Sequence, residues 1–241
     1  MPKFTFSDFM YAISHPLQAG RYLRHRDRIG YDICAKYLPD APVIVEAGAY
    51  DGSTTRDFCR FWPRCEVYCF EPVPSAYERM LKVAAEYPDR IHPQKMALGS
   101  ATADAEMNVS VTGAEGGEQS SSLLPPSATR KEFPFVGFRE ETIPVRVTRL
   151  EEWAAVNNVR PIDFLWLDLQ GMELAALEGC GDLLSAVAAI HCEVQNVALY
   201  DQAPMYPEVS AWLQRRGFRV AHEALFRRGG NVLFVREQPR P

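Results

Sequence analysis

The sequence lacks a surplus of positive charge, since 26 Lys and Arg residues stand against 31 Asp and Glu residues, a formal net charge of -5. Contacts to phosphates need a basic surface, so this balance argues against a nucleic-acid partner. Basic residues do gather between Arg21 and Arg28, where a solvated helix face accounts for them. The sequence also lacks an apolar run long enough to span a bilayer and the apolar core of a signal peptide. We therefore expect no stable membrane insertion.

Cysteine is sparse, and its spacing excludes the common metal and disulfide motifs. The six cysteines are Cys34, Cys59, Cys65, Cys69, Cys180 and Cys192. They form neither a C-x-x-C motif nor a Cys/His spacing of the kind that holds zinc. We expect reduced, partly buried thiols in a cytoplasmic protein, and no bound metal.

The length of 241 residues, 47% of them hydrophobic, suits one large domain with a small N-terminal extension. Residues 1–42 are predicted to form that extension. Its apolar residues favour one amphipathic helix near Phe4–Ile13 and a second that ends at Tyr37, before Pro39 and Pro42. These helices are candidates for a lid or for the contact surface of a homodimer. Residues 43–241 are predicted to form the main domain.

The first half of the main domain alternates strands and helices. The predicted order is strand Val43–Ala47, helix Thr54–Phe61, strand Glu66–Phe70, helix Pro74–Tyr87 and strand Ile91–Leu98. This β-α-β-α-β order predicts a parallel sheet with right-handed crossovers.

The second half continues the pattern after a long irregular segment. The predicted strands are Ala105–Val111, Thr142–Thr148, Ile162–Leu167 and Ala186–Val194, and the predicted helices are Leu150–Asn157, Glu173–Cys180 and Tyr206–Arg216. Thr112–Glu141 is rich in Gly, Ser and Pro, and such a segment inside a compact domain is usually functional or disordered. Phe218–Ala221 and Asn231–Val235 predict a closing hairpin.

The main domain is organised around Val43–Thr54, where an apolar strand ends in an acid and a glycine turn leads into a helix. Gly48 and Gly52 allow a tight turn and close approach of backbone to a ligand. Ser53 or Thr54 is the predicted N-cap of the helix. Such a unit presents backbone N–H groups and a positive helix end at a strand tip. An ordinary turn without a ligand is the alternative.

Four acids stand at predicted strand ends, and their charge bears on the choice of ligand. They are Glu46, Glu71, Asp168 and Glu193. In an open parallel sheet, ligands bind beyond the carboxyl ends of the strands, and an acid after the second strand holds ribose hydroxyls. The first turn lacks the last glycine of G-x-G-x-x-G, and Glu46 and Asp51 would repel a pyrophosphate. A ligand with sulfonium and ammonium groups would be attracted, which favours S-adenosylmethionine (SAM) over NAD.

Four motifs extend this interpretation: E-A-G-A-Y-D-G-S-T, C-F-E-P-V-P, A-L-G-S and F-L-W-L-D-L-Q-G-M-E-L-A-A-L-E-G. Together they resemble the FkbM family of SAM-dependent methyltransferases, and the resemblance extends from about Val43 to Val235. It implies the Rossmann-like class I methyltransferase fold. In that α/β fold a mostly parallel seven-stranded sheet has an antiparallel last strand and helices on both faces.

The resemblance also implies site residues. The SAM-binding residues would be Glu46, Gly48, Ala49, Tyr50, Asp51, Gly52, Ser53, Thr54, Glu71, Pro72, Ala97, Leu98 and Asp168. Asp168, Gln170 and Glu173 match the acidic motif of the family and would lie near the transferred methyl group and the acceptor. Tyr200 follows a predicted strand end, where it is a candidate to line the acceptor pocket or to pack in a surface loop.

We expect an O-methyltransferase that acts on a hydroxyl of a small metabolite or sugar. Its first candidate base is Asp168, with Glu193, His191 and His222 as further candidates. Asp168 could instead only orient a ligand, and Glu173 could merely begin a helix. A divalent cation among the acids is a weaker alternative. Two other functions stay open, namely a nicotinamide-dependent oxidoreductase and a non-catalytic SAM-binding partner module.

Overall fold

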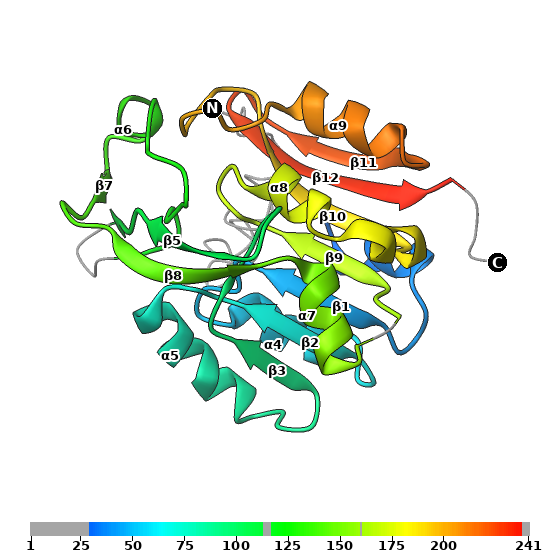
Figure 1. Cartoon of the computed structure of the whole chain (residues 1–241). Coiled ribbons are helices and arrows are strands. Elements are labelled where there is room, and N and C mark those ends of the chain that lie inside the picture. The colour runs from blue at the N-terminus through cyan, green and yellow to red at the C-terminus, as the bar shows by residue number, and fades with distance from the viewer. Residues whose placement is uncertain (1–28, 113–116, 160, 238–241) are drawn as a thin grey trace, which may run out of the picture.

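A seven-stranded sheet forms the centre of the computed structural model, which describes residues 29–112, 117–159 and 161–237. Its strand order is β11-β12-β10-β9-β1-β2-β3 (Figure 1). The strands are β1 (Val43–Ala47), β2 (Glu66–Phe70), β3 (Ile91–Gln94), β9 (Phe164–Leu167), β10 (Ala189–Gln195), β11 (Phe218–Leu225) and β12 (Gly229–Arg236). Strands from β3 through β10 are parallel, whereas β12 runs antiparallel to β10 and β11. The predicted sheet and its closing hairpin are confirmed.

The direction in which strands are added reverses between β1 and β9. From β1 the chain proceeds outward through β2 to β3, and later returns to the other side of β1 through β9 and β10. Ala47 at the end of β1 pairs with both Phe70 and Leu167, so the three strands end at one level. A crevice at this reversal is where open α/β sheets bind ligands.

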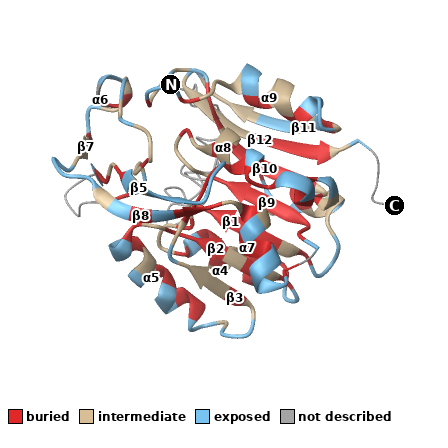
Figure 2. Ribbon diagram, in the orientation of Figure 1, coloured by how far each residue is buried: buried red, intermediate tan, exposed pale blue. Residues whose placement is uncertain are grey.

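Helices cover both faces of the sheet because successive strand residues point to opposite sides. Ile44 packs in one buried cluster and Val45 in the other. The Ile44 side is covered by α3 (Tyr31–Cys34), α4 (Ser53–Phe61) and α5 (Pro74–Ala84). The Val45 side is covered by α7 (Leu150–Asn157), α8 (Glu173–Glu178), α9 (Tyr206–Gln214) and the 3-10 helix η2 (Gly181–Ala186). The buried strands lie between these layers (Figure 2).

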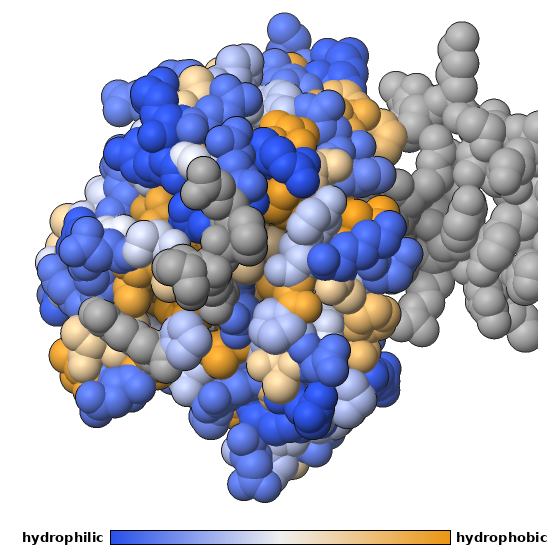
Figure 3. Space-filling model, turned by 90° about the vertical axis from the view of Figure 1, so that its right-hand side faces the viewer, coloured by the Kyte–Doolittle hydropathy of each residue, from blue (hydrophilic) through white to orange (hydrophobic). Residues whose placement is uncertain are grey.

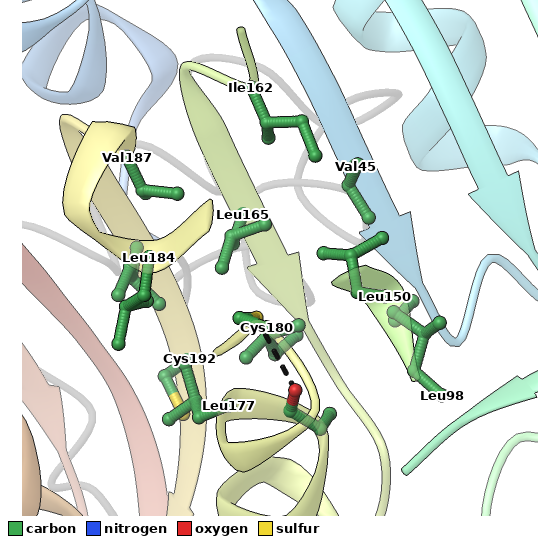
Figure 4. Packing of buried hydrophobic residues seen from close by; sticks show 14 of the residues in the cluster. Val45, Leu98, Leu150, Ile162, Leu165, Leu177, Cys180, Leu184, Val187 and Cys192 are labelled. Atoms are coloured by element: carbon green, nitrogen blue, oxygen red, sulfur yellow. Dashed lines mark hydrogen bonds between the residues drawn. The ribbon is translucent and has the colours of Figure 1, made fainter. Parts of the chain in front are cut away.

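The core on the Val45 side shows how tightly sheet and helices are joined. Val45 and Leu165 of the sheet lie opposite Leu150 and Leu177 of the helices, all at most 1% exposed (Figure 4). Truncating such a buried Leu to Ala costs roughly 2–5 kcal/mol. All six cysteines are buried, and none of them forms a disulfide. The close packing of the helices on the sheet therefore fixes the positions of the strand ends that carry the site.

The start of α4 differs from the prediction. Gly52 is the N-cap, with φ 77°, and no side chain caps the helix. Ser53 and Thr54 already belong to the first helical turn, so the prediction that one of them caps it was wrong. The Asp51 carboxylate accepts the Ser53 N–H at 3.0 Å and closes the turn instead.

Two small sheets lie beside the main one. β4 (Ala97–Leu98), β8 (Ile143–Thr148) and β5 (Ala103–Met107) form one, and β6 (Ser110–Thr112) and β7 (Val136–Phe138) form the other. The predicted strand Ile91–Leu98 is therefore two strands in different sheets. We call residues 117–139 the canopy, which contains α6 (Thr129–Glu132) and β7. Most of the canopy has irregular structure, as predicted.

The predicted N-terminal helices lie largely outside the described residues. Within them, Tyr31–Cys34 is a short helix and Ala35–Tyr37 a 3-10 turn, while Ile29 and Cys34 are buried. The face of the protein shown in Figure 3 is mostly hydrophilic, with hydrophobic residues in small patches. No helix among the described residues is long and apolar enough to cross a membrane.

Candidate active site

The glycine turn after β1 packs directly against the end of β9. The backbone N–H groups of Gly48 and Ala49 donate to the Phe70 carbonyl at 3.0 and 3.1 Å. Gly48 has φ 83°, and a Cβ atom placed there would lie 1.9 Å from the Asp168 carbonyl oxygen. Only glycine fits this position, because any side chain would separate the turn from β9. The tip of β1 and the tip of β9 thus form one continuous wall.

The four predicted acids reach the same cavity, of about 250 Å³, at the carboxyl ends of the parallel strands. Glu46, Asp168 and Glu193 alternate with residues of the Val45-side core, so they point to the Ile44 side. Glu46 is 1% exposed and accepts the hydroxyl of Thr55 on α4. The sequence-based prediction that neighbouring strand tips gather acids is confirmed.

Most of the predicted cofactor residues line this cavity. They are Glu46, Gly48, Ala49, Tyr50, Ser53, Thr54, Glu71, Pro72, Ala97, Leu98 and Asp168, and Gln170 and Glu193 line it as well. Glu118 adds a fifth carboxylate. Among the described residues that line the cavity there is neither Lys nor Arg. The lining itself therefore attracts cations and disfavours a pyrophosphate.

Glu71 lies at the tip of β2 with both carboxylate oxygens held. Oε2 accepts the Tyr50 N–H and Oε1 accepts the Val73 N–H, each at 2.8 Å. The side chain is 5% exposed. Burial raises the pKa of Glu71 to about 7, although the two backbone N–H groups oppose the rise. Each oxygen keeps a lone pair for a further donor such as a ribose hydroxyl.

Gln170 connects two of the acids. Its Nε2 donates to Asp168 Oδ1 at 2.7 Å and to Glu193 Oε2 at 2.6 Å. Its Oε1 lies 3.0 Å from the hydroxyl of Tyr200. The backbone of Gln170 has φ 53°, an uncommon conformation for a residue with a side chain. Asp168 and Glu193 are therefore presented together.

Five of the predicted residues do not line the cavity, and the structure shows where each lies instead. Asp51 and Gly52 shape the turn from outside. Glu173 is 3% exposed and accepts the backbone N–H groups of Leu169 and Gly171, so it folds back on its own loop. Its burial raises its pKa to about 7. A direct contact of Glu173 with the acceptor, as predicted, does not fit this position.

Tyr200 and His222 also lie away from the lining. Tyr200 is 1% exposed and reaches the site only through its contact with Gln170, which replaces the predicted direct contact with the acceptor. His222 is exposed on β11, opposite Leu233 and outside the residues that line the cavity. It is not supported as a candidate base, because an edge strand carries it away from the other candidates.

Sequence reasoning missed the contribution of the canopy. Glu118 is 5% exposed, and its carboxylate accepts bonds from Ser75 at 2.6 Å, Arg139 at 2.7 Å and Arg79 at 2.9 Å. The Arg79 guanidinium also lies over the Tyr50 ring, 4.9 Å from its centre. The signal lay in the run of serines and leucines at residues 120–124, but the partners of Glu118 are distant in sequence.

Two of the aromatic rings that line the cavity stack on each other. Trp166 of β9 and His191 of β10 are paired in the sheet and stack with ring centres 3.5 Å apart and an angle of 1° between the planes. The sequence predicts His191 only as a secondary candidate base and does not single out Trp166. The described residues contain no group of three or more His, Cys, Asp or Glu placed to hold a metal ion.

This sheet order, with a carboxylate-rich cavity at the strand reversal, is that of a class I, SAM-dependent methyltransferase. Residues 46–220 match the methyltransferase FkbM domain, and the chain belongs to that family. A nicotinamide-dependent oxidoreductase is thereby disfavoured.

The chain is also similar to two known proteins. It is 29% identical over 170 residues, 69% of either chain, to the 2-O-methyltransferase NoeI of Sinorhizobium fredii. Its fold resembles Aeropyrum pernix fibrillarin in complex with natively bound SAM, with a TM-score of 0.50 and 12% identity over 87% of this chain and 76% of the other. The second likeness concerns the fold alone.

Proposed function

We propose that the protein transfers the methyl group of SAM to a hydroxyl of a small-molecule acceptor, a sugar or another metabolite. The observation that carries the proposal is the cavity with five carboxylates and, among its described lining residues, no cationic side chain. Such a lining favours a positively charged ligand over a phosphate-bearing one. The relative NoeI, which is named as a 2-O-methyltransferase, supports oxygen as the methylated atom.

The residues that line the cavity fit three parts of SAM, namely the ribose, the adenine and the methionine part. Glu71, with its remaining lone pairs, suits the two ribose hydroxyls. Ala97 and Leu98 provide an apolar surface for the adenine. The positive N-terminal end of α4 suits the carboxylate of the methionine part, and Gly48 lets that part approach the backbone of the turn closely. When bound, SAM supplies a methyl group on a positively charged sulfur.

The remaining task of the protein is to align the acceptor hydroxyl and to take its proton. Holding two reactants in a near-attack geometry supplies much of the acceleration in such a displacement. Asp168 and Glu193 both line the cavity, and a carboxylate within hydrogen-bonding reach of the hydroxyl serves as a general base. We assign the base to Asp168 and the holding of the acceptor to Glu193. Asp168 lies at the junction with the glycine turn, nearer to the proposed cofactor position.

Calorimetry and a transfer assay test this proposal. The full chain should bind SAM and S-adenosylhomocysteine but not NAD. Incubation with methyl-labelled SAM and a panel of sugars and hydroxylated metabolites should give products heavier by one methyl group. Asp168→Asn should lower the rate of transfer by about 10²- to 10⁴-fold while the variant still binds SAM. Binding of NAD in preference to SAM would refute the proposal, and SAM binding with no transfer to any hydroxyl would favour a non-catalytic module.

Four broader features belong to the same proposal. We infer that residues 43–241 form the catalytic domain and residues 1–42 a helical extension. The free, buried cysteines support a reducing compartment such as the cytoplasm. The net charge of -5 supports an acceptor other than nucleic acid. Whether the protein is a homodimer is tested by light scattering of the full chain, where a mass near 54 kDa, twice the 27.2 kDa of one chain, would support it.

A further inference from the structure

One amide nitrogen holds two carboxylates in the cavity. Asp168 Oδ1 and Glu193 Oε2 lie 2.7 and 2.6 Å from Gln170 Nε2, so each takes one of its two hydrogens. The two oxygens are therefore held a few ångströms apart, one directly after strand β9 and the other on strand β10. Two carboxylates this close repel each other, and a donor shared between them offsets that repulsion.

The orientation of the amide is determined by its surroundings. Gln170 Oε1 faces the hydroxyl of Tyr200 at 3.0 Å, and that hydroxyl also lies 2.8 Å from the Ser120 carbonyl. A flipped amide would place its oxygen against two carboxylates, which is electrostatically unfavourable. The Ser122 hydroxyl donates to the backbone carbonyl of Gln170 at 2.8 Å. The canopy thus supports both the side chain and the strained backbone of Gln170.

Tyr200 does not line the cavity, although its hydroxyl approaches the amide that does. A buried tyrosine hydroxyl usually has a hydrogen-bond partner, and here it has two acceptors within reach. Burial raises the pKa of this hydroxyl, so it stays protonated and available as a donor. Tyr200 can therefore act on the acids only through Gln170.

We propose that Gln170 and Tyr200 are positioning residues, which hold Asp168 and Glu193 side by side so that one carboxylate binds the acceptor hydroxyl and the other removes its proton. This inference rests on the proposed function, because it assigns work to the two acids in methyl transfer. It adds a role to Gln170, which is predicted to lie near the acceptor, and to Tyr200, which is predicted to line the acceptor pocket or to pack in a surface loop.

The acids have other titratable neighbours, and the test must separate their effects. Glu46 on β1 and His191 on β10 line the same cavity, and Glu173 on α8 and Cys192 on β10 interact electrostatically with the pair. Among the described lining residues no Lys or Arg compensates the charge of the pair. Removing the amide donors should therefore have a large effect on how the pair titrates.

The experiment follows the two carboxyl groups directly by carbon-13 NMR titration of the full chain. Gln170→Met keeps the length and unbranched shape of the side chain but removes both donors. Tyr200→Phe removes only the hydroxyl that contacts Gln170 Oε1. Tyr206→Phe is the matched control, since that hydroxyl donates to Glu223 outside the cavity. The variants are first compared with the wild type for thermal stability and SAM affinity.

Loss of donors to the charged form should raise the titration midpoints of the Asp168–Glu193 pair in Gln170→Met. Tyr200→Phe should raise them less, and Tyr206→Phe should leave them unchanged. The acid limb of the pH–rate profile for methyl transfer should move by the same amounts. Wild-type titration in both Gln170→Met and Tyr200→Phe would overturn the inference.

The transfer assay separates this inference from the function on which it rests. If methyl transfer to a hydroxyl proceeds with an unchanged acid limb in Gln170→Met, the positioning role is refuted and the proposed function stands. If the carboxyl groups titrate as expected but the wild type transfers no methyl group to any hydroxyl, the proposed function is refuted. If the midpoints and the acid limb move together, both are supported.

Discussion

Glu71 offers the most direct link between a buried charge and cofactor binding. Its pKa of about 7, raised by burial from 4.5, means that the folded protein holds a proton there that the unfolded chain has released between these values. Ionised Glu71 therefore costs on the order of 3 kcal/mol of stability above pH 7. That cost is absent below pH 4.5 and develops as the pH rises from 4.5 to 7.

Glu71→Gln removes the charge and should make stability less dependent on pH. An amide has one oxygen where the carboxylate had two, so either the Tyr50 or the Val73 N–H loses its acceptor, at about 1–3 kcal/mol. The melting temperature should consequently change little at pH 8, and its fall between pH 5 and pH 8 should become shallower. Glu173, also with a pKa of about 7 because of burial, should account for the slope that remains.

The same substitution should weaken the binding of the cofactor. Hydrogen bonds to a charged group contribute about 1.5–3 kcal/mol, so the loss of the ribose contact should lower affinity roughly 10- to 100-fold. In the wild type the ionised carboxylate is the better acceptor, so affinity should fall as the pH drops below 7. In Glu71→Gln this dependence should disappear.

Calorimetry with S-adenosylhomocysteine, which has the same ribose and cannot transfer a methyl group, measures both effects. Titrations at pH 6, 7 and 8 should show wild-type affinity increasing with pH, together with proton release on binding. Glu173→Gln is the control, because this acid contacts its own loop and not the cavity. The amino group of the ligand titrates equally with every variant, so differences between variants isolate Glu71. A wild-type affinity independent of pH, or a loss below twofold in Glu71→Gln, would refute the reasoning.

Three further predictions concern the base, the turn and the canopy. Asp168→Asn should lower kcat by about 10²- to 10⁴-fold with SAM affinity retained, as measured by labelled-methyl transfer and calorimetry. Gly48→Ala should lower the free energy of unfolding by about 2 kcal/mol or more, because a Cβ would meet the Asp168 carbonyl, and denaturant titration measures this. Glu118→Gln should leave Arg79 and Arg139 without their carboxylate and speed proteolysis of the canopy while the main sheet stays protected. Unchanged proteolysis would mean that other contacts hold the canopy.

The arrangement of the sheet was predictable because it depends on local patterns. Short apolar runs such as Val43–Ala47 and Phe164–Leu167 are buried on both faces, which is the pattern of central parallel strands. An acid directly after such a run lies at the carboxyl edge of the sheet. The parallel order therefore brought Glu46 and Asp168 together without knowledge of any contact.

The predictions that failed depend on strand pairings or side-chain orientations that the local sequence pattern does not contain. The break between β3 and β4 arises because Ala97 pairs with Val147 of another sheet, and nothing near Ala97 in the sequence announces that partner. Glu173 matches a motif, but its carboxylate turns toward its own backbone. His222 is an ionisable residue on a strand, and only the strand order shows that this strand is the outer edge.

The canopy has a consequence for how such enzymes diversify. It supplies Gln119, Ser121 and Leu123 to the cavity, yet it forms no strand of the main sheet among the described residues. Backbone hydrogen bonds to Asn108 and Leu199 anchor it, together with the side chains of Glu118 and Glu132, the latter paired with Arg227 and Arg228. On the proposed function, we expect substitutions between these anchors to change this part of the cavity lining while the strand tips stay in place. Exchange of the canopy between relatives should then change which acceptors are methylated.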